Sequence, residues 1–245
     1  EANPGGAPCN VLAMLTKLGH KTAFIGKVGE DFFGEQLRDA ITEVGIDADG
    51  LCTDKEIHTT LAMVHTYPDG DRDFSFYRNP GADMMLNKEE ICEDIIKETK
   101  IFHFGTLSMT HEGVREATKE AIRIAEESGA VISFDPNLRP PLWNSLDEAK
   151  EQVLYGLKHC HILKISDNEI QWLTGEEDYT AGVNWIRERY QIPLILVSMG
   201  KEGSRAYYNG MMIEAKPFLQ KNTIETTGAG DTFCGCVLHY ICEHG

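Results

Sequence analysis

The stretch Thr226-Thr227-Gly228-Ala229-Gly230-Asp231 runs directly into a segment, Thr232 to Ile241, whose apolar residues recur with helical spacing. This pattern predicts a glycine-rich loop that opens a helix. Because Gly228, Ala229 and Gly230 carry little or no side chain, backbone N–H groups at the helix start can close around an anion, and the helix dipole favours its charge. We therefore predict a phosphate or oxyanion site at this loop.

Asp231 is unexpected beside an anion site, because its carboxylate repels phosphate unless it has a chemical task such as taking a proton from an attacking hydroxyl. This combination points to phosphoryl transfer to an alcohol. The alternative is an ordinary capped helix, with Thr226 or Thr227 as N-cap and Asp231 as a first-turn acid that complements the dipole. The stretch alone does not choose between the two interpretations.

A second glycine-containing motif, Gly5-Gly6-Ala7-Pro8-Cys9-Asn10, lies near the start of the chain and is followed by Gly19 and Gly29. The two motifs resemble the N-terminal and C-terminal signatures of the ribokinase-like (PfkB) carbohydrate kinases, and they occur in the family order. The resemblance implies that Asp231 is the catalytic base and that the N–H groups of Gly228, Ala229 and Gly230 stabilise the transferring phosphoryl. Three positions depart from the family pattern, namely Leu12, Glu225 and Cys236.

Composition excludes several classes of partner. The 245 residues are 42% hydrophobic and 25% charged, which is ordinary for one large globular domain. The formal net charge of -16 should repel nucleic acid and anionic membrane, so a small-molecule partner fits better. Seven scattered cysteines without a CxxC pair indicate reduced thiols in a cytoplasmic protein. We find no signal peptide, and the longest apolar run, Ile192 to Met199, is too short to span a membrane.

Strands alternate with helices from Ile101 to Val197, which predicts an α/β fold with a mainly parallel central sheet and helices on both faces. Ligands of such sheets bind beyond the carboxyl ends of the strands. Nearer the start of the chain, we expect a strand from Thr22 to Ile25 and a helix that ends near Val44. Two strands around the turn at 68–71 predict a β-hairpin that acts as a lid over a site, or alternatively lies on the sheet edge.

We expect one ribokinase-like kinase domain over residues 1–245, with the lid hairpin inserted at about 57–79. The chain lacks an initiator Met, and compared with the resembling family it reads as a fragment without both family termini. The lid is also the surface through which we expect a homodimer.

The loop after the strand Val131 to Phe134 reads Asp135-Pro136-Asn137-Leu138-Arg139. An arginine presents several fixed donors to an oxyanion, and this position follows a strand end. The loop is similar to the Asp-Pro-Asn-x-Arg element of fructokinases and ketodeoxygluconate kinases. That resemblance implies that Arg139 lies near the transferring phosphate or the substrate and Asn137 near the nucleotide. A surface salt bridge is the alternative for Arg139.

Three residues are candidates for metal sites. Ser166-Asp167-Asn168-Glu169 resembles the family's Asn-x-x-Glu region, which implies that Glu169 helps to hold the water shell of a phosphate-bound Mg²⁺. Ser166 and Glu169 also form a capping box, which needs no metal. By resemblance, Glu225 and Thr227 occupy positions where related enzymes hold a monovalent cation such as K⁺, although the family usually has Asp in place of Glu225.

The remaining candidates are assigned by resemblance to the two substrates. The ATP side comprises Ser198, Gly200, Lys201 and Gly203, whose glycines an ordinary turn would explain equally well. The sugar side comprises Gly6, Asn10, Tyr77 and Arg78. Asn10 offers a donor and an acceptor to vicinal hydroxyls, whereas the aromatic residues of the hairpin are also consistent with simple packing.

Taken together, these motifs are most similar to those of bacterial fructokinases. The resemblance implies an ATP- and Mg²⁺-dependent sugar kinase that converts D-fructose to fructose 6-phosphate at a primary hydroxyl. Ketodeoxygluconate, ribose or a nucleoside stays open as acceptor. A protein of another class, a sugar- or nucleotide-binding module without turnover, also stays open because fold does not determine function.

Overall fold

The computed structural model describes residues 3–66, 72–218 and 227–244. It divides the chain into two compact units, one formed by residues 1–95, 111–121 and 223–245 and the other by residues 96–110 and 122–222. The turn predicted at 68–71, together with Glu225 and Thr226, lies outside the described residues. A single kinase domain over the whole chain stays a prediction.

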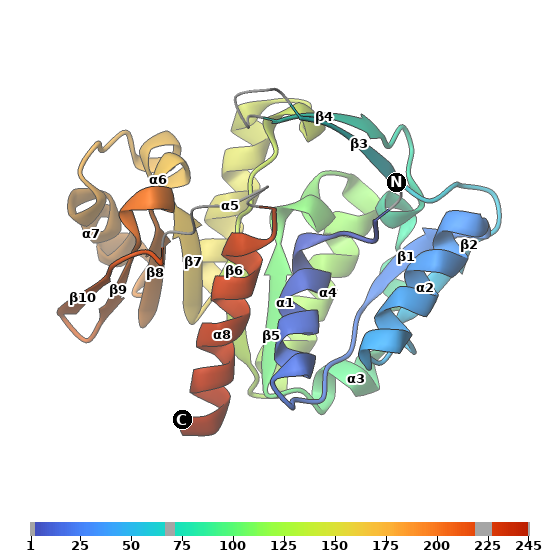
Figure 1. The fold of residues 1–245 in the computed structure, drawn as a ribbon, viewed down its shortest axis with the longest axis horizontal. Coiled ribbons are helices and arrows are strands. Elements are labelled where there is room, and N and C mark those ends of the chain that lie inside the picture. Colours follow the sequence, from blue (N-terminus) through green and yellow to red (C-terminus); the bar gives the residue numbers. More distant parts are fainter. Residues whose placement is uncertain (1–2, 67–71, 219–226, 245) are drawn as a thin grey trace. The chain divides into compact units, whose positions relative to one another are not determined.

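The helices and strands follow one another as drawn in Figure 1. The α-helices are α1 (Ala7–Lys17), α2 (Phe32–Val44), α3 (Glu93–Lys97), α4 (Glu112–Glu127), α5 (Leu146–His159), α6 (Asp167–Thr174), α7 (Tyr179–Tyr190) and α8 (Ala229–His244). The strands are β1 (Gly26–Gly29), β2 (Leu51–Asp54), β3 (Leu61–Thr66), β4 (Arg72–Tyr77), β5 (Ile101–Gly105), β6 (Val131–Asp135), β7 (Ile162–Ser166), β8 (Leu194–Ser198), β9 (Ser204–Tyr208) and β10 (Met211–Ala215). Short 3₁₀ helices are η1 (Ala82–Met85), η2 (Lys88–Glu90), η3 (Thr106–Met109), η4 (Pro140–Leu142) and η5 (Gly200–Glu202).

The second unit is built on a six-stranded sheet in the order β10-β9-β8-β7-β6-β5. Strands β5 to β8 are parallel, and β9 and β10 add an antiparallel edge. The central strands are buried along most of their length, which explains why they read as continuous apolar runs rather than alternating ones. Helices α5 and α6 pack on β6 and β7. The predicted α/β fold with a mainly parallel sheet flanked by helices is confirmed.

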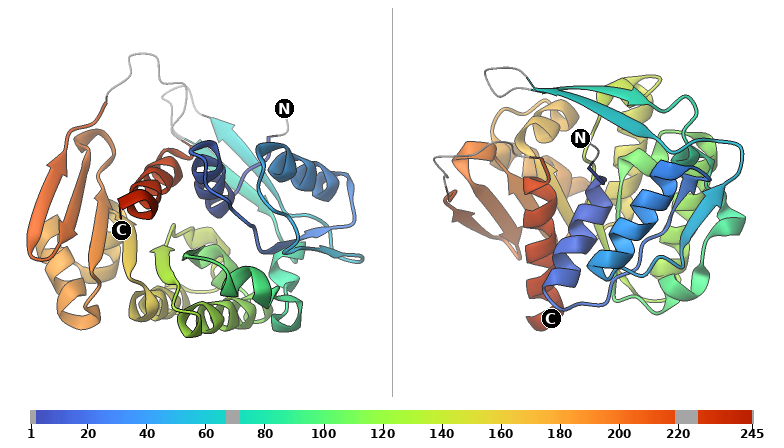
Figure 2. Two further views of the ribbon diagram at one scale, coloured as in Figure 1. Left: turned by 90° about the horizontal axis from the view of Figure 1, so that it is seen from below. Right: turned by 45° about the vertical axis from the view of Figure 1, so that its right-hand side comes forward.

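The first unit contains α1 and α8 side by side, as both views in Figure 2 also show. The two helices approach closely at Gly235, where an added Cβ would lie 2.9 Å from the Cβ of Met14 and 3.1 Å from the carbonyl of Val11. The parallel pair β1–β2 packs with α2 around a small core of Val28, Ile41, Ile46 and Leu51. Cys9, Leu12 and Ala13 of α1 pack against this core, which therefore positions the start of α1.

The predicted β-hairpin is present. Strands β3 and β4 pair antiparallel, with Leu61 opposite Tyr77 and Ala62 opposite Phe76. Several of its side chains are exposed, including Met63 and Val64 on β3. That this hairpin covers a ligand stays a prediction.

The strand expected from Thr22 to Ile25 is wrong: that segment makes only a single bridge, from Ala23 to Asp47, and the strand lies at Gly26–Gly29. Residues Gly26–Gly29 pair in register with Leu51–Asp54. The burial of Lys27 in this strand is possible because its amine bonds to the carboxylates of Asp54 and Glu90. Pairing with β2 therefore makes Gly26–Gly29 a strand, although glycine is rare in strands.

None of the helices in the described ranges has both the length and the apolar character that crossing a bilayer requires.

Candidate active site

The first unit brings together two predicted site residues that lie 221 positions apart in the sequence: Asn10 Nδ2 donates a hydrogen bond of 2.8 Å to Asp231 Oδ2. Asn10 belongs to the first turn of α1 and Asp231 to the first turn of α8. Asp231 is buried, with 8% of its surface exposed. A carboxylate fixed by one amide donor at the start of two adjacent helices has a defined direction, as a base must have.

The loop before α8 requires a glycine. Gly228 has a φ of 77°, which L side chains rarely adopt, and an added Cβ would lie 3.5 Å from Asn10 Nδ2 and 4.0 Å from Asp231 Oδ2. The first intrahelical bond runs from Thr232 N to the carbonyl of Gly228 at 2.8 Å. The N–H groups of the residues between them point out of the helix start without a carbonyl of their own helix, so this end fits a phosphate oxygen.

Gly6 is the N-cap of α1, and its carbonyl accepts the N–H of Asn10 at 2.9 Å. A Cβ at Gly6 would meet nothing within 4 Å, so the backbone is open to a small molecule there.

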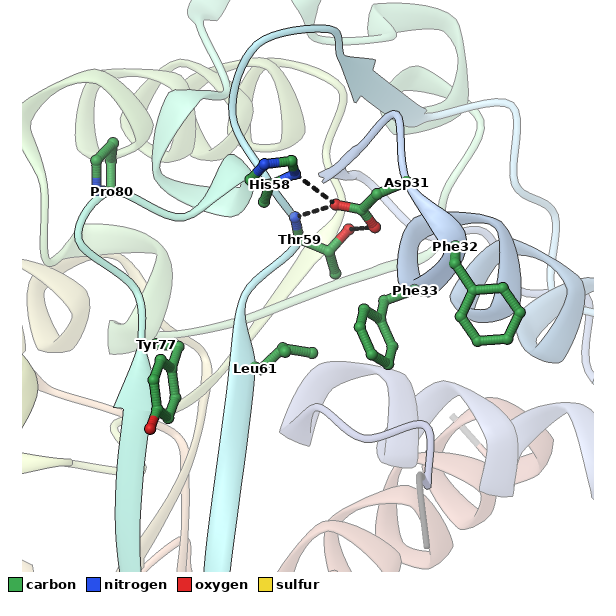
Figure 3. Close-up of a pocket in the computed structure, with 8 residues that line it drawn as sticks. All are labelled: Asp31, Phe32, Phe33, His58, Thr59, Leu61, Tyr77 and Pro80. Atoms are coloured by element: carbon green, nitrogen blue, oxygen red, sulfur yellow. Dashed lines mark hydrogen bonds and ion pairs between the residues drawn. The ribbon is translucent and has the colours of Figure 1, made fainter.

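The same unit contains an open hollow of about 380 Å³, and Figure 3 shows the side chains that line it. Its lining residues are Asp31, Phe32, Phe33, His58, Thr59, Leu61, Tyr77 and Pro80. Tyr77, a predicted sugar-side residue, lies on the hairpin with 64% of its surface exposed. The hollow thus joins the hairpin to the start of α2 and offers aromatic faces beside polar groups, a common make-up of small-molecule sites.

Asp31 connects the parts of this hollow, and the sequence reasoning missed it. Its carboxylate caps α2 through Gly34 N at 2.9 Å and accepts the N–H of Thr59 at 2.8 Å and the Thr59 hydroxyl at 2.8 Å. Burial raises the pKa of Asp31, but the hydrogen bonds from Thr59, Gly34 and His58 outweigh it and hold that pKa below its ordinary value. The available signal was an Asp directly before an amphipathic helix.

Arg78 has a partner that the sequence did not reveal. Its Nε and Nη2 lie 2.8 and 2.6 Å from Asp83 Oδ2, and the hydroxyl of Thr60 bonds to the same carboxylate. Only 5% of the Arg78 side chain is exposed. The structure therefore places Arg78 in a network at the base of the hairpin, and direct contact with a sugar stays a prediction.

In the second unit, Glu169 joins the loop after β6 to the start of α6. Its Oε1 accepts the N–H of Leu138 at 2.7 Å, and its Oε2 accepts Ser166 N at 2.8 Å and Ser166 Oγ at 2.7 Å. The capping box is confirmed. Because a carboxylate offers about four acceptor positions, three protein donors leave room for about one water. Glu169 thus fits the water shell of Mg²⁺ rather than the ion itself, and this role stays a prediction.

The loop itself is compact. Asn137 adopts a φ of 45°, and Arg139 Nη1 donates to the carbonyl of Leu138 at 3.1 Å and, more weakly, to that of Asn137 at 3.5 Å. No surface ion pair of Arg139 appears among the described residues. The guanidinium is folded back on its own loop and still has donors to present to an anion.

Below this loop, charged groups lie inside the sheet. Lys164 Nζ on β7 lies 3.0 Å from Asp135 Oδ2 on β6, and 8% and 4% of the two side chains are exposed. His103 Nδ1 on β5 lies 3.0 Å from Ser133 Oγ. Burial, and then the charge of Lys164, lowers the pKa of His103 to about 4, so the ring is neutral at pH 7. The sequence reasoning missed this network. Its signal is a charged residue in an apolar strand, with Lys164 in the middle of β7 and Asp135 at the end of β6.

The predicted ATP-side residues follow β8. Ser198 pairs with Ser204 across the strands, and Lys201 is exposed in η5. Gly203 is required by the fold, because an added Cβ would lie 2.2 Å from the carbonyl of Ala215, whereas a Cβ at Gly200 would meet nothing within 4 Å. Of these two glycines, Gly200 is the one whose backbone is open to the close approach of a ligand.

Of the two monovalent-cation candidates, Glu225 lies outside the described residues and Thr227 is exposed directly before Gly228.

The whole chain, residues 1–245, matches the pfkB family of carbohydrate kinases. The chain belongs to the pfkB carbohydrate kinases. A similar protein, probable fructokinase-4 of Arabidopsis thaliana, is 41% identical to this chain over 243 residues. The match covers 98% of this chain and 73% of that protein. The pfkB assignment makes the chain a phosphotransferase with an alcohol group as acceptor.

Solved structures agree with this assignment. The fructokinase of Xylella fastidiosa with bound ATP superposes with a TM-score of 0.89 at 32% identity, covering 98% of this chain and 74% of that one. The fructokinase of Vibrio cholerae O395 in its fructose-, ADP- and calcium-bound form has a TM-score of 0.86 at 30% identity, covering 96% and 75%. The ribokinase-like fold predicted for this pfkB chain is confirmed.

Proposed function

We propose that this pfkB kinase transfers the γ-phosphoryl group of ATP to a primary hydroxyl of D-fructose and yields ADP and fructose 6-phosphate. The observation that carries the proposal is the hydrogen-bonded pair of Asn10 and Asp231 beside the glycine-rich start of α8. Similarity to fructokinases over nearly the whole chain supports fructose as the acceptor. Ketodeoxygluconate and ribose are the alternative acceptors.

Asp231 is the base in this proposal. Because Oδ2 accepts the amide hydrogen of Asn10, we assign Oδ1 to the proton of the attacking hydroxyl. The N–H groups of Gly228, Ala229, Gly230 and Asp231 then stabilise the charge that develops on the transferring phosphoryl oxygens. Bound ATP with Mg²⁺ supplies the phosphoryl group and neutralises part of its charge.

The other predicted residues take supporting roles. We assign Gly6, Asn10 and Tyr77 to the sugar, Arg139 to the phosphate or substrate, and Asn137, Ser198, Gly200, Lys201 and Gly203 to the nucleotide. Glu169 is assigned to a water of the Mg²⁺ shell, and Glu225 with Thr227 to a K⁺ site. The free state of all seven cysteines fits a reducing compartment such as the cytoplasm.

The hairpin is proposed to serve as a subunit contact as well as a lid. Met63 and Val64 are 56% and 51% exposed on β3, and exposed apolar side chains on a two-stranded sheet favour association with another surface. A homodimer through this hairpin follows as the expected assembly.

A coupled assay of ADP release tests the proposed function. It compares kcat/KM for fructose, ribose, ketodeoxygluconate, glucose and adenosine on the same preparation. We expect fructose to give the highest value. A clear preference for the acidic sugar would reassign the protein to ketodeoxygluconate phosphorylation, and sugar binding without any turnover would favour the binding-module alternative.

Replacing Arg78 with Ala is expected to raise the KM for fructose by about 10-fold or more, with kcat little changed, because a hydrogen-bonded charge at the base of the hairpin is lost. Asp83→Asn is the matched variant, since the guanidinium is bound to Asp83. If Arg78 acts through this pair, both variants raise KM by a similar factor. A much larger rise for Arg78→Ala would indicate direct contact with the sugar. If Arg78→Ala weakens the dimer but leaves kcat and KM for the sugar unchanged, the hairpin serves as a subunit contact and does not act on the sugar.

A further inference from the structure

A group of metal-ligating side chains lies at the opposite end of α1 and α8 from Asp231. His20, His239 and Glu243 each offer one ligand atom, and these atoms all lie within 4.8 Å of one another. His20 Nε2 is 2.7 Å from His239 Nδ1 and 3.9 Å from Glu243 Oε1. Among the described residues this is the one such cluster, and nothing in the proposed kinase chemistry uses it.

The fold brings these residues together for a simple reason. Helices α1 and α8 run side by side in the same direction (Figure 1), so the loop after α1 meets the last turns of α8. His20 lies three residues beyond the end of α1, while His239 and Glu243 are four residues apart on α8 and therefore share one face. Hydrophobic packing of the two helices, fixed at Gly235, holds the three side chains at one place without a metal.

The side chains differ in exposure in a way that suits an ion reached from solvent. The His20 side chain is 19% exposed and that of Glu243 is 55% exposed. The two rings meet edge to face with centroids 5.0 Å apart, and the two nitrogens that would bind an ion, His20 Nε2 and His239 Nδ1, face each other at 2.7 Å.

We propose that His20, His239 and Glu243 form a binding site for a divalent transition-metal ion of the zinc type, with water as its fourth ligand. Two imidazole nitrogens and one carboxylate are a ligand set suited to Zn²⁺, and an open fourth position is usual where three protein ligands bind. Tetrahedral Zn–N bonds of about 2.0–2.1 Å place two nitrogens about 3.3 Å apart, so the rings separate by roughly 0.6 Å. The ring that donates the hydrogen bond changes tautomer, so that its proton lies on its other nitrogen and the shared point is free for the ion. The bound ion clamps the C-terminal ends of the helices whose N-terminal ends carry Asn10 and Asp231.

This site is separate from the Mg²⁺ of the kinase reaction. Asp231 and His239 are eight residues apart on α8, about 12 Å along the helix axis. Mg²⁺ prefers oxygen ligands and keeps several waters, so a set with two imidazoles discriminates against it. The site goes beyond the proposed function, and its failure would leave that function untouched.

Titration calorimetry with Zn²⁺ tests the proposal on the whole chain, in a Cys236→Ser background because Cys236 is an exposed thiol. We expect one ion per chain and no competition from equimolar Mg²⁺. His239→Ala and Glu243→Gln are each expected to raise the Kd at least about 10-fold. His244→Ala is the matched control, because it removes a neighbouring histidine of the same helix that lies outside the cluster, and it should leave the Kd unchanged.

Glu243→Gln keeps the test decisive if the His239 variant does not fold, since Glu243 is half-exposed and its replacement does not disturb the core. A Co²⁺ spectrum adds a second readout: we expect ligand-field bands without a thiolate-to-cobalt charge-transfer band. The proposal is overturned if Zn²⁺ binds with the same Kd to Glu243→Gln and the parent, if no stoichiometric ion binds, or if the Co²⁺ spectrum shows thiolate ligation.

Discussion

Replacing Asp231 with Asn is expected to lower kcat with fructose by about 10²- to 10⁴-fold, the usual contribution of general acid–base catalysis. The substitution keeps the size of the side chain, and Asn10 can still donate to its carbonyl oxygen in place of the bond to Oδ2. What is lost is the ability to take the hydroxyl proton. Affinity for ATP should hold or improve slightly, because one negative charge leaves the neighbourhood of the phosphates. Steady-state kinetics and nucleotide titration on the same folded variant measure both effects.

Asp39→Asn is a suitable control for this experiment, because it removes one carboxylate from an exposed position on α2 and should leave kcat near normal. If Asp231 only complements the dipole of α8, its replacement would change stability slightly and leave turnover close to that of the parent. Near-normal kcat in Asp231→Asn would remove this residue from the mechanism.

Replacing Lys164 with Met is expected to lower the free energy of unfolding by about 3–5 kcal/mol, because it leaves Asp135 as a buried charge without this partner. The two side chains are 8% and 4% exposed and their charged atoms are 3.0 Å apart, so solvent screens the pair little. Urea denaturation of the parent and variant at pH 7 measures the change.

Lys119→Met is the matched control, since the pair of Lys119 and Glu116 lies on the exposed face of α4 and its loss should cost less than about 1 kcal/mol. Combining Lys164→Met with Asp135→Leu should recover much of the stability, because both charges are then absent. A loss below about 1 kcal/mol for Lys164→Met alone would show that Asp135 finds an equivalent partner and that the pair does not support the loop above it.

The parts of the fold that follow from local pattern could be predicted from the sequence. The alternation of apolar runs with amphipathic segments predicted the parallel sheet of the second unit, and Ser166 with Glu169 predicted a capping box that the structure contains. The glycine-rich start of α8 was predicted as a helix opening, and Gly228 has the positive φ that makes glycine necessary there.

The parts that depend on long-range pairing could not be predicted. The strand at Gly26–Gly29 exists because it pairs with β2, although glycine is rare in strands. Arg78 was predicted to lie on the sugar side, and nothing in the sequence indicates that the chain turns back to place Asp83 beside it. The buried pair of Lys164 and Asp135 comes from two strands, and neither strand by itself shows that its charge has a partner.

The most direct measurement for the proposed reaction is NMR identification of the product formed from ATP, Mg²⁺ and an equimolar mixture of fructose, ribose and ketodeoxygluconate. The proposed chemistry predicts one fructose 6-phosphate for each ADP released, with little of the other two phosphates, and strongly reduced product with Asp231→Asn. A product phosphorylated mainly on ketodeoxygluconate or ribose, a phosphate on C1 of fructose, or ADP formed with inorganic phosphate alone would contradict it.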